Sequence, residues 1–375
     1  MIKNGLRLIS TGLTNVQTAL RGCNFTSAKL PGNAMPWFGM DIGGTLSKLV
    51  FFEPKDSPTT QTEDEILSNV TQYLTKNSAY GKSGHRHAHL QMDNVQICNR
   101  LGTLHFIRFL TSEMNNFLDL SKKIGMADNV PTVCATGGGA YKFEDIFKNE
   151  LNLKLRKCDE LDSLIRGLLF TVASNNNECY SWPQCTEYEQ CSTQEYTFQY
   201  NEYPFIVVNI GSGVGVLAVY GPNHYKRISG TCIGGGTFLA LCGGLTGCDT
   251  FDEAIELAAK GDNLKIDQLV QDIYGGDYSK IGLPGREIAS SFGKMNSKDK
   301  WAQASPEDVA RAALVGVTKN ISSIVRPWAI IEKTDRVCFV GNFLHVNPIA
   351  TKLLSDAMMD YGYKAIFLNH ERFKE

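Results

Sequence analysis

The sequence predicts an α/β fold of two lobes, because one unit of strand, glycine turn and strand occurs twice in it. The first copy spans Phe38–Val50, where an apolar run ending in Asp41 is followed by two glycines and a second apolar run. The second copy starts at Phe205 and has Asn209 where the first has Asp41. Glycines let backbone N–H groups approach a phosphate closely, and a carboxylate at a strand end can hold hydrated Mg²⁺. The repeat therefore indicates a duplicated fold with a nucleotide between its halves.

The first unit has two interpretations. Thr45 and Lys48 place a hydroxyl and a cation beside Gly43 and Gly44, as a phosphate site requires. An ordinary β-hairpin with a Gly-Gly turn would also have this pattern, and Asp41 would then have only a structural role. The recurrence of glycine turns further along the chain favours the phosphate site.

Two junctions of strand, glycines and helix follow. The apolar run Thr132–Ala135 leads into Gly137-Gly138-Gly139, and Gly234-Gly235-Gly236 precedes a predicted helix over 238–245. A helix N-terminus presents unpaired N–H groups that can bind a phosphate, whereas a tight turn in a close-packed sheet also needs glycine. Both explanations stay open for these junctions. Near the end, a predicted strand over 337–340 runs into Gly341-Asn342.

A predicted amphipathic helix begins near Glu160, with leucine and isoleucine at helical spacing after it. Asp159, Glu160 and Asp162 crowd its start, where acidic side chains suit the helix dipole. The alternative is that one of them, Glu160, is a general base facing a cleft.

The length of 375 residues predicts two domains. We place an N-terminal lobe over 36–202, which includes a polar surface insertion at 173–202, and a C-terminal lobe over 203–375. Further helices are predicted at 250–260, 264–273 and 306–328. The net charge of −2 gives no electrostatic reason to expect nucleic acid as a partner, and the long uncharged stretches contain too many glycines for a membrane span.

Residues 1–35 contain Lys3, Arg7, Arg21 and Lys29 and no acidic residue. This composition is typical of a mitochondrial transit peptide, although a disordered N-terminal extension would have it too. The expected location is therefore cytoplasmic or mitochondrial. Most of the 11 cysteines are predicted to be reduced, because they stand singly in apolar runs and lack the close pairing of structural zinc sites.

Several motifs resemble known families. Strand–DIGGT–strand, NIGSG–strand and a late VGN turn resemble the phosphate and adenosine loops of the actin, hexokinase and Hsp70 superfamily. Longer blocks over residues 36–371 resemble the eukaryotic (type II) pantothenate kinases: PWFGMDIGGTLSKL, LHFIRF, CATGGGAYKFE, CDELDSLIRGLL, YKRISGT, GLPG and FVGNFLHVN.

The resemblance implies a duplicated RNase H-like fold with two lobes and ATP in the cleft between them. It also implies transfer of the ATP γ-phosphoryl group to pantothenate with Mg²⁺, the first step of coenzyme A biosynthesis, by a homodimer or a heterodimer with a paralogue, subject to CoA or acetyl-CoA feedback. By motif, Glu160 matches the general base, Ser212 and Arg227 match residues that bind pantothenate, and Asp41 matches the residue that holds Mg²⁺ through water. The positions matched to ATP binding are Asp41, Gly43, Gly44, Thr45, Lys48, Gly234, Gly235, Gly236, Gly341 and Asn342.

Several departures from that family are visible. Gly215 stands where a serine that binds substrate is usual, which predicts the loss of one hydrogen bond. Residues 360–363 lack a tryptophan associated with the acyl-CoA pocket, and residues 370–375 differ from the family's glycine-rich final helix. Two further hypotheses follow: a catalytically weak paralogue that acts as a CoA sensor or heterodimer partner, and a sugar or N-acetylhexosamine kinase of the same superfamily.

Overall fold

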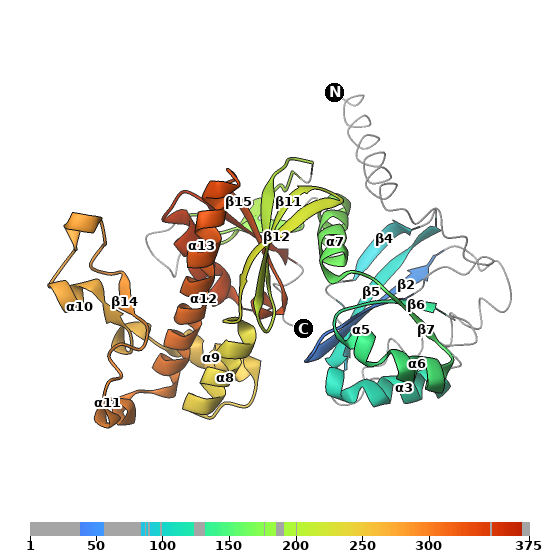
Figure 1. Ribbon diagram of the computed structural model, residues 1–375, viewed down its shortest axis with the longest axis horizontal. Coiled ribbons are helices and arrows are strands. Elements are labelled where there is room, and N and C mark those ends of the chain that lie inside the picture. Colours follow the sequence, from blue (N-terminus) through green and yellow to red (C-terminus); the bar gives the residue numbers. More distant parts are fainter. Residues whose placement is uncertain are drawn as a thin grey trace. The chain divides into compact units, whose positions relative to one another are not determined.

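The computed structural model divides the chain into two compact units, the first ending at Ser174 and the second beginning at Asn175 (Figure 1). The structure describes residues 38–55, 84–86, 88, 91–97, 100–123, 132–175, 177–184, 191–199, 201–345 and 347–369. The predictions for the leader, 1–35, and for the final residues, 370–375, lie outside the described residues. No helix in the described stretches combines the length and apolar character that crossing a bilayer requires.

The first unit contains a seven-stranded sheet in the order β3-β5-β2-β1-β6-β7, with β4 paired to β5. β1, β2 and β5 are antiparallel neighbours, whereas β6 and β7 run parallel to β1. Numbered along the chain, the five main strands therefore lie in the order third, second, first, fourth, fifth. The strands are β1 (Phe38–Ile42), β2 (Leu46–Pro54), β3 (His85–Arg86), β4 (Met92–Ile97), β5 (Arg100–Leu110), β6 (Thr132–Thr136) and β7 (Lys154–Lys157).

Side chains alternate across this sheet, as a strand requires. The helices α3, α5 and α6 cover one face of this sheet (Figure 1). Along β1, Phe38, Met40 and Ile42 are buried in the core that these helices share, so Asp41 points to the other face. On β2, Phe52 packs instead with Phe170 of α7. The helical segments of this unit are η3 (Thr111–Glu113), α3 (Met114–Lys123), α5 (Gly139–Lys142), α6 (Glu144–Leu151) and α7 (Glu160–Ser174).

The second unit contains a seven-stranded sheet in the order β12-β11-β10-β15-β16-β8-β9. β10, β11 and β12 are antiparallel neighbours, and β15 and β16 run parallel to β10. The RNase H-like strand order is therefore present in both units, which confirms the fold class predicted from the sequence. The strands are β8 (Cys179–Ser181), β9 (Gln194–Tyr196), β10 (Phe205–Ile210), β11 (Val214–Gly221), β12 (His224–Thr231), β15 (Arg336–Val340) and β16 (Lys364–Leu368).

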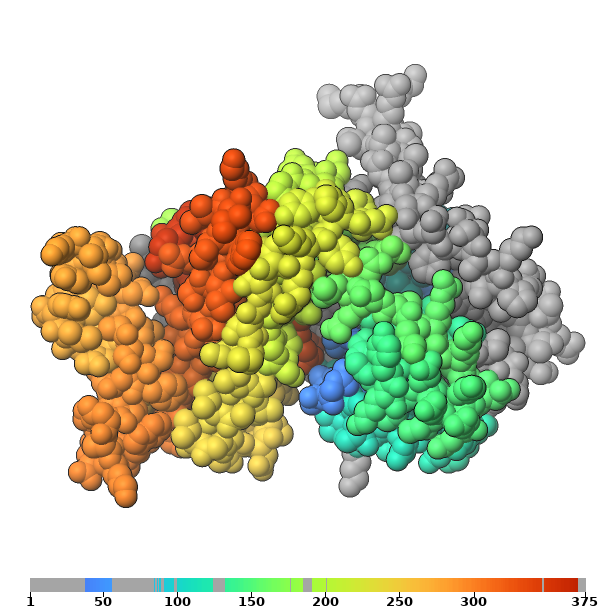
Figure 2. All heavy atoms as spheres, viewed as in Figure 1, coloured from blue at the N-terminus to red at the C-terminus, as the bar shows by residue number. Residues whose placement is uncertain are grey.

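The long helix α12 packs against this sheet together with α8, α9 and α13. Ser305 caps α12 through the Asp308 N–H, and Pro306 begins it, as sequence rules favour. Residues 262–304 form a projection beside α12, drawn in orange in Figure 2. The remaining segments are α8 (Gly235–Thr246), α9 (Phe251–Lys260), η5 (Asn263–Lys265), β13 (Gln268–Leu269), α10 (Val270–Tyr274), η6 (Ser279–Ile281), β14 (Ile288–Ser290), α11 (Lys298–Gln303), α12 (Pro306–Ile331), η7 (Asn342–Leu344) and α13 (Pro348–Met359).

The polar segment predicted as an insertion of the N-terminal lobe, 173–202, lies mostly in the second unit. Its strand β8 pairs with β16, where Tyr180 is opposite Phe367 and their ring centroids are 5.5 Å apart. Both rings are buried. Because the residues around β8 and β9 are polar, these two short strands were not predicted from the sequence. The structure also places the division between the units after Ser174 rather than after residue 202.

The single helix predicted over 264–273 is divided into η5, β13 and α10. The reason is Asp267, whose buried carboxylate accepts hydrogen bonds from the Phe292 N–H and from Asn263 Nδ2. These bonds tie the chain to the segment after β14 and interrupt the helix. A second difference concerns Cys191, which is in a disulfide bond rather than reduced.

Candidate active site

The first glycine turn joins β1 to β2 as a hairpin, with Asp41 opposite Lys48. The Lys48 Nζ lies 3.4 Å from Asp41 Oδ2, and the two side chains are 47% and 40% exposed. An exposed ion pair of this kind contributes little to stability. Both side chains are therefore accessible to a ligand. The segment is a β-hairpin, and the residues of this hairpin are also the ones that the second interpretation assigns to a phosphate site.

Hydrogen bonds from Thr111, the first residue of η3, hold the turn of this hairpin. The Gly43 N–H donates to the Leu46 carbonyl at 2.9 Å, and a Cβ atom at Gly43 would lie 2.8 Å from that oxygen. The Thr111 hydroxyl donates to the Gly43 carbonyl at 2.9 Å, and its N–H donates to the Thr45 carbonyl at 2.8 Å. Gly44 and Thr45 remain exposed at the tip of a fixed turn.

The second glycine turn lies beside Asp41, because β6 is parallel to β1 and Thr136 is opposite Asp41. Gly137 has φ +82°, and a Cβ atom there would lie 2.6 Å from the Ile42 carbonyl and 2.9 Å from Asp41 Oδ1. These distances favour the close-packing explanation of this turn. The Thr136 hydroxyl, which the sequence analysis did not single out, is buried without a hydrogen-bond partner among the described residues.

Glu160 begins α7 just after β7, which is parallel to β6. Asp159 caps the helix, since its Oδ1 accepts the Asp162 N–H at 2.8 Å. Asp159, rather than Glu160, therefore satisfies a backbone N–H at the start of this helix. The Glu160 side chain is exposed and makes no hydrogen bond or ion pair within the described part of the chain. The ends of β1, β6 and β7 thus bring Asp41, the Gly137 turn and Glu160 to one edge of the sheet.

In the second unit the turn Gly211-Ser212-Gly213 packs against the start of α8. The N–H groups of Gly235 and Gly236 donate to the carbonyls of Gly211 and Ser212 at 2.9 and 3.0 Å. Cβ atoms at Gly234 and Gly235 would lie 2.8 Å from the Ser212 and Gly211 carbonyls, respectively. Glycine is required here for close packing, and the Ser212 side chain is left exposed.

Gly341 follows β15 and lies beside the end of β10. It has φ +115°, and a Cβ atom there would lie 2.8 Å from Asn209 Oδ1 and closer still to the Ile210 carbonyl. Asn342 comes next and opens η7. The structure therefore brings together Asn209, the Ser212 turn, the start of α8 and Gly341, which the sequence placed far apart.

Arg227 is exposed on β12, opposite Leu217. Its guanidinium extends along the strand, because a Cβ atom at Gly230 would lie 2.5 Å from Arg227 Nη2. Gly230 is opposite Gly215, which lies just beyond the turn that carries Ser212. The guanidinium of Arg227 therefore reaches the turn end of this hairpin. A Cβ atom at Gly215 would have no heavy atom of the described residues within 4 Å.

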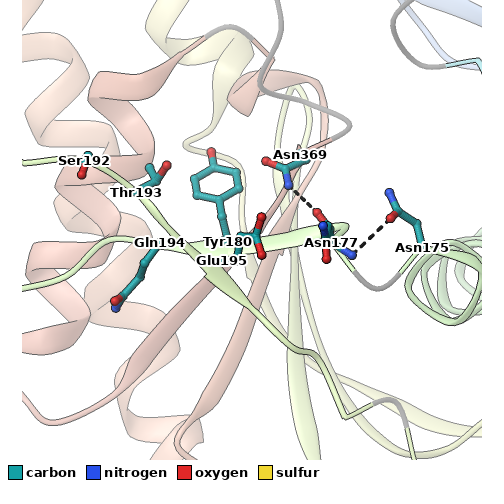
Figure 3. A pocket seen from close by; sticks show the side chains of 8 residues that line it. All are labelled: Asn175, Asn177, Tyr180, Ser192, Thr193, Gln194, Glu195 and Asn369. Atoms are coloured by element: carbon teal, nitrogen blue, oxygen red, sulfur yellow. Dashed lines mark hydrogen bonds between the residues drawn. The ribbon is translucent and has the colours of Figure 1, made fainter. Parts of the chain in front are cut away.

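A separate cavity of about 530 Å³ lies in the second unit, near β8 and β9 (Figure 3). Amide and hydroxyl side chains dominate it, and the Asn369 Nδ2 donates to the Asn177 carbonyl there. None of the predicted site residues lines it. The lining residues are Asn175, Asn177, Tyr180, Ser192, Thr193, Gln194, Glu195 and Asn369.

Comparison with known proteins gives a family for most of the chain. A family model described as Fumble matches residues 37–374. A rice protein called pantothenate kinase 2 is 36% identical over 355 residues, which cover 89% of this chain but only 37% of that protein. An Arabidopsis thaliana protein called pantothenate kinase 1 is 37% identical over 340 residues, covering 89% of this chain and 82% of the relative.

Among solved structures, the crystal structure of glucokinase from Balamuthia mandrillaris in complex with glucose is similar at 13% identity. The alignment covers 95% of this chain and 94% of that one, with a TM-score of 0.40. The strand order of the two sheets, rather than this likeness, carries the fold assignment.

Proposed function

Because this chain belongs to the Fumble family, as its match over residues 37–374 shows, we propose that it is a pantothenate kinase. In this reaction the γ-phosphoryl group of ATP is transferred to the primary hydroxyl of pantothenate, giving 4'-phosphopantothenate and ADP. The plant relatives that share its sequence over most of its length are called pantothenate kinases.

The observation that carries the proposal is the edge formed by the ends of β1, β6 and β7. Asp41 and Glu160 lie on this edge. Asp41 is in an exposed ion pair with Lys48, and Glu160 has no hydrogen-bond or ion-pair partner among the described residues. Since Asp159 caps α7, the Glu160 carboxylate is left to accept a proton. We assign Glu160 as the general base that removes the hydroxyl proton of pantothenate as its oxygen attacks the γ-phosphorus.

Asp41 would hold Mg²⁺ through water. The described residues contain no cluster of three His, Cys, Asp or Glu side chains that could enclose a metal. A partly exposed carboxylate such as Asp41, which is ion-paired with Lys48, fits Mg²⁺, because this ion keeps several waters and binds through one or two carboxylates and the substrate phosphates. When bound, the ion neutralises charge on the transferred phosphoryl group.

The remaining assignments follow from charge and exposure. Lys48 and the exposed tip at Gly44 and Thr45 would contact the ATP phosphates, and Gly43, Gly234–Gly236, Gly341 and Asn342 would shape the nucleotide site by close packing. Arg227 would bind the carboxylate of pantothenate, because guanidinium recognises carboxylate with paired hydrogen bonds. Ser212 would add a hydroxyl contact to the same substrate.

The test is transfer of radiolabelled phosphate from ATP to pantothenate by the purified chain. Losing a positioned general base costs on the order of 10²–10⁴ in rate, so Glu160→Gln is expected to lower kcat by that amount. Glu150→Gln is the matched control, since Glu150 is an exposed helical carboxylate paired with Lys122. Arg227→Ala is expected to raise KM for pantothenate, whereas Lys226→Ala, its exposed neighbour on β12, leaves it unchanged.

Equal rates for Glu160→Gln and Glu150→Gln would refute the assigned base. Phosphorylation of glucose or N-acetylglucosamine in place of pantothenate would favour the sugar-kinase hypothesis. ATP or CoA binding without turnover would favour a weak paralogue that acts as a sensor or heterodimer partner.

We also propose a homodimer, feedback by CoA or acetyl-CoA, and a cytoplasmic or mitochondrial location. These rest on the family resemblance and on the basic, acid-free residues 1–35. Sedimentation measures the first, acetyl-CoA titration of turnover the second, and import with and without residues 2–35 the third.

A further inference from the structure

The turn Gly43-Gly44-Thr45, here called the phosphate turn, receives two hydrogen bonds from one residue outside the hairpin. The Thr111 hydroxyl donates to the Gly43 carbonyl at 2.9 Å, and the Thr111 N–H donates to the Thr45 carbonyl at 2.8 Å. Thr111 is buried and lies 68 positions after Gly43 in the chain. Both bonds end on backbone oxygens, so Thr111 fixes the backbone of the turn while Gly44 and Thr45 stay exposed.

These bonds determine the direction of the N–H groups in the phosphate turn. A trans peptide unit is planar, and its C=O and N–H point in opposite directions. The bond to the Gly43 carbonyl therefore turns the Gly44 N–H away from Thr111. The bond to the Thr45 carbonyl fixes the peptide after Thr45, so the peptide between Gly44 and Thr45 is held at both ends. Neither the Gly44 N–H nor the Thr45 N–H donates to another described residue.

A second buried hydroxyl supports Thr111. Ser47 Oγ lies 3.0 Å from Thr111 Oγ1, and Ser47 is fully buried on β2. A hydroxyl has one proton, and that of Thr111 goes to the Gly43 carbonyl, which can only accept. Ser47 is therefore the donor to Thr111. Donation from Ser47 to Thr111 to the Gly43 carbonyl leaves the Thr111 hydroxyl with one orientation.

We propose that Thr111 and Ser47 are positioning residues of the nucleotide site, which hold the two unbonded N–H groups of the phosphate turn in place for the terminal phosphates of ATP. Asp41, which would hold Mg²⁺, comes just before the turn, so the phosphates that reach the turn are those that share the ion. The inference rests on the part of the proposed function that concerns ATP, and not on pantothenate as the acceptor. Thr111 acts through the backbone, and Ser47 acts through Thr111.

The physical reason is preorganisation. Consecutive backbone N–H groups in a turn form a concavity that binds anions. A turn already held in its binding conformation loses little conformational freedom when the phosphate arrives, so it binds more tightly than a turn that must first be ordered. Without the Thr111 hydroxyl, the Gly43 carbonyl and the Ser47 hydroxyl both lose a partner, and the peptide between Gly43 and Gly44 is less restrained.

The test measures binding of ATP with Mg²⁺ to the purified full chain by calorimetry. Thr111→Val removes the hydroxyl but keeps the N–H and the side-chain shape, so it is expected to weaken ATP binding about 3- to 10-fold, the range of one hydrogen bond. Thr111→Ser restores a hydroxyl and should bind ATP as the wild type does. Thr318→Val is the matched control, because Thr318 is a buried threonine of α12 whose hydroxyl donates to the Leu314 carbonyl in the second unit.

Variants of Ser47 test the order of donation. Ser47→Ala should weaken ATP binding only about 2- to 3-fold, because Thr111 can still donate to the Gly43 carbonyl. Added to Thr111→Val, Ser47→Ala should cause no further loss, since Ser47 acts only through the Thr111 hydroxyl. A further loss in the double variant, or unchanged binding in Ser47→Ala alone, would refute the role of Ser47. Ser47→Ala also tests the proposal if Thr111→Val folds poorly.

The positioning role of Thr111 is overturned by any of four results. These are wild-type affinity for ATP in Thr111→Val, a loss that Thr111→Ser does not restore, an equal loss in Thr318→Val, and a wild type that binds no ATP. A merely structural role would lower the thermal stability of Thr111→Val and leave the ATP affinity of the folded protein unchanged.

Turnover separates this inference from the proposed function. In the kinase assay, Thr111→Val should raise KM for ATP by the factor found in the binding measurement and leave KM for pantothenate unchanged. A chain whose ATP binding depends on Thr111 as expected, but which phosphorylates no pantothenate, would refute the proposed function and support the positioning role. Phosphorylation of pantothenate with the same KM for ATP in Thr111→Val and the wild type would do the reverse.

Discussion

In the first unit Asp41 lies opposite Lys48, whereas in the second unit Asn209 occupies the same place and lies opposite Gly215. In each unit the first strand of the hairpin is the central strand of the sheet, and the two sheets have the same strand order. Where the first unit has an ion pair, the second unit has an amide opposite a glycine. The two hairpins have the same backbone structure but differ in their charged side chains.

The packing next to these residues is the same in both copies. Gly137 lies beside Asp41 and the Ile42 carbonyl, and Gly341 lies beside Asn209 and the Ile210 carbonyl. Both glycines have positive φ. Because each follows the parallel strand next to the central one, the constraint comes from strand pairing, not from the ligand that either turn would bind.

The two turns are held by different means. In the first unit the Thr111 side chain and backbone bind the turn, and in the second the backbone of Gly235 and Gly236 does so. Close backbone contact leaves no room for a side chain at the start of α8. The comparison indicates that chemistry diverged at exposed positions, while the packed positions stayed restricted to glycine or a single hydrogen-bonding side chain.

The largest expected effect is that of Asp41→Asn, which gives the first unit the residue of the second. The amide cannot replace the carboxylate that would hold Mg²⁺, so kcat for pantothenate is expected to fall on the order of 10²-fold or more. Thermal stability should change little, since Asn209 shows that an amide fits the frame and the ion pair with Lys48 is exposed. Steady-state kinetics with a Mg²⁺ titration and thermal unfolding measure both; undiminished turnover would contradict the assigned role of Asp41.

Replacing the equivalent glycines tests whether the shared frame is a packing constraint. Gly137→Ala and Gly341→Ala should each lower the free energy of unfolding by about 1–3 kcal/mol, because a Cβ atom meets backbone and φ is positive. Gly44→Ala is the control, since none of the described residues has a heavy atom within 4 Å of a Cβ atom at Gly44. Denaturant unfolding measures all three, and similar losses for Gly44 and Gly341 would argue against the packing explanation.

The smallest effect is expected for Gly215→Ser, which adds a hydroxyl opposite Gly230, the residue that the Arg227 guanidinium approaches. One hydrogen bond contributes about 0.5–1.5 kcal/mol, so KM for pantothenate should fall about 2- to 10-fold with kcat unchanged. The site has space for the side chain, since a Cβ atom at Gly215 meets no heavy atom of the described part of the chain within 4 Å. Gly215→Ala supplies the same backbone without the hydroxyl, and an equal gain in that variant would show that the hydroxyl is not the cause.

Local patterns predicted much of the fold. Both hairpins, the strand β6 and the helices α9 and α12 lie where the sequence pattern predicted them, within a few residues. Patterns failed where long-range pairing decided the structure: β8 is a strand because Tyr180 packs on Phe367, and the helix near Asp267 is interrupted by bonds to Asn263 and Phe292.

The sequence by itself determined which chemical groups are present and which turns carry them, because a strand end, a glycine pair and a carboxylate are local features. Only the tertiary structure decided their neighbours. Strand pairing puts Gly137 against Asp41 and Gly341 against Asn209. Among the described residues, Glu160 has no hydrogen-bond or ion-pair partner, while Asp159 caps α7. The register of parallel strands fixes such contacts between residues far apart in the chain, and no local pattern contains it.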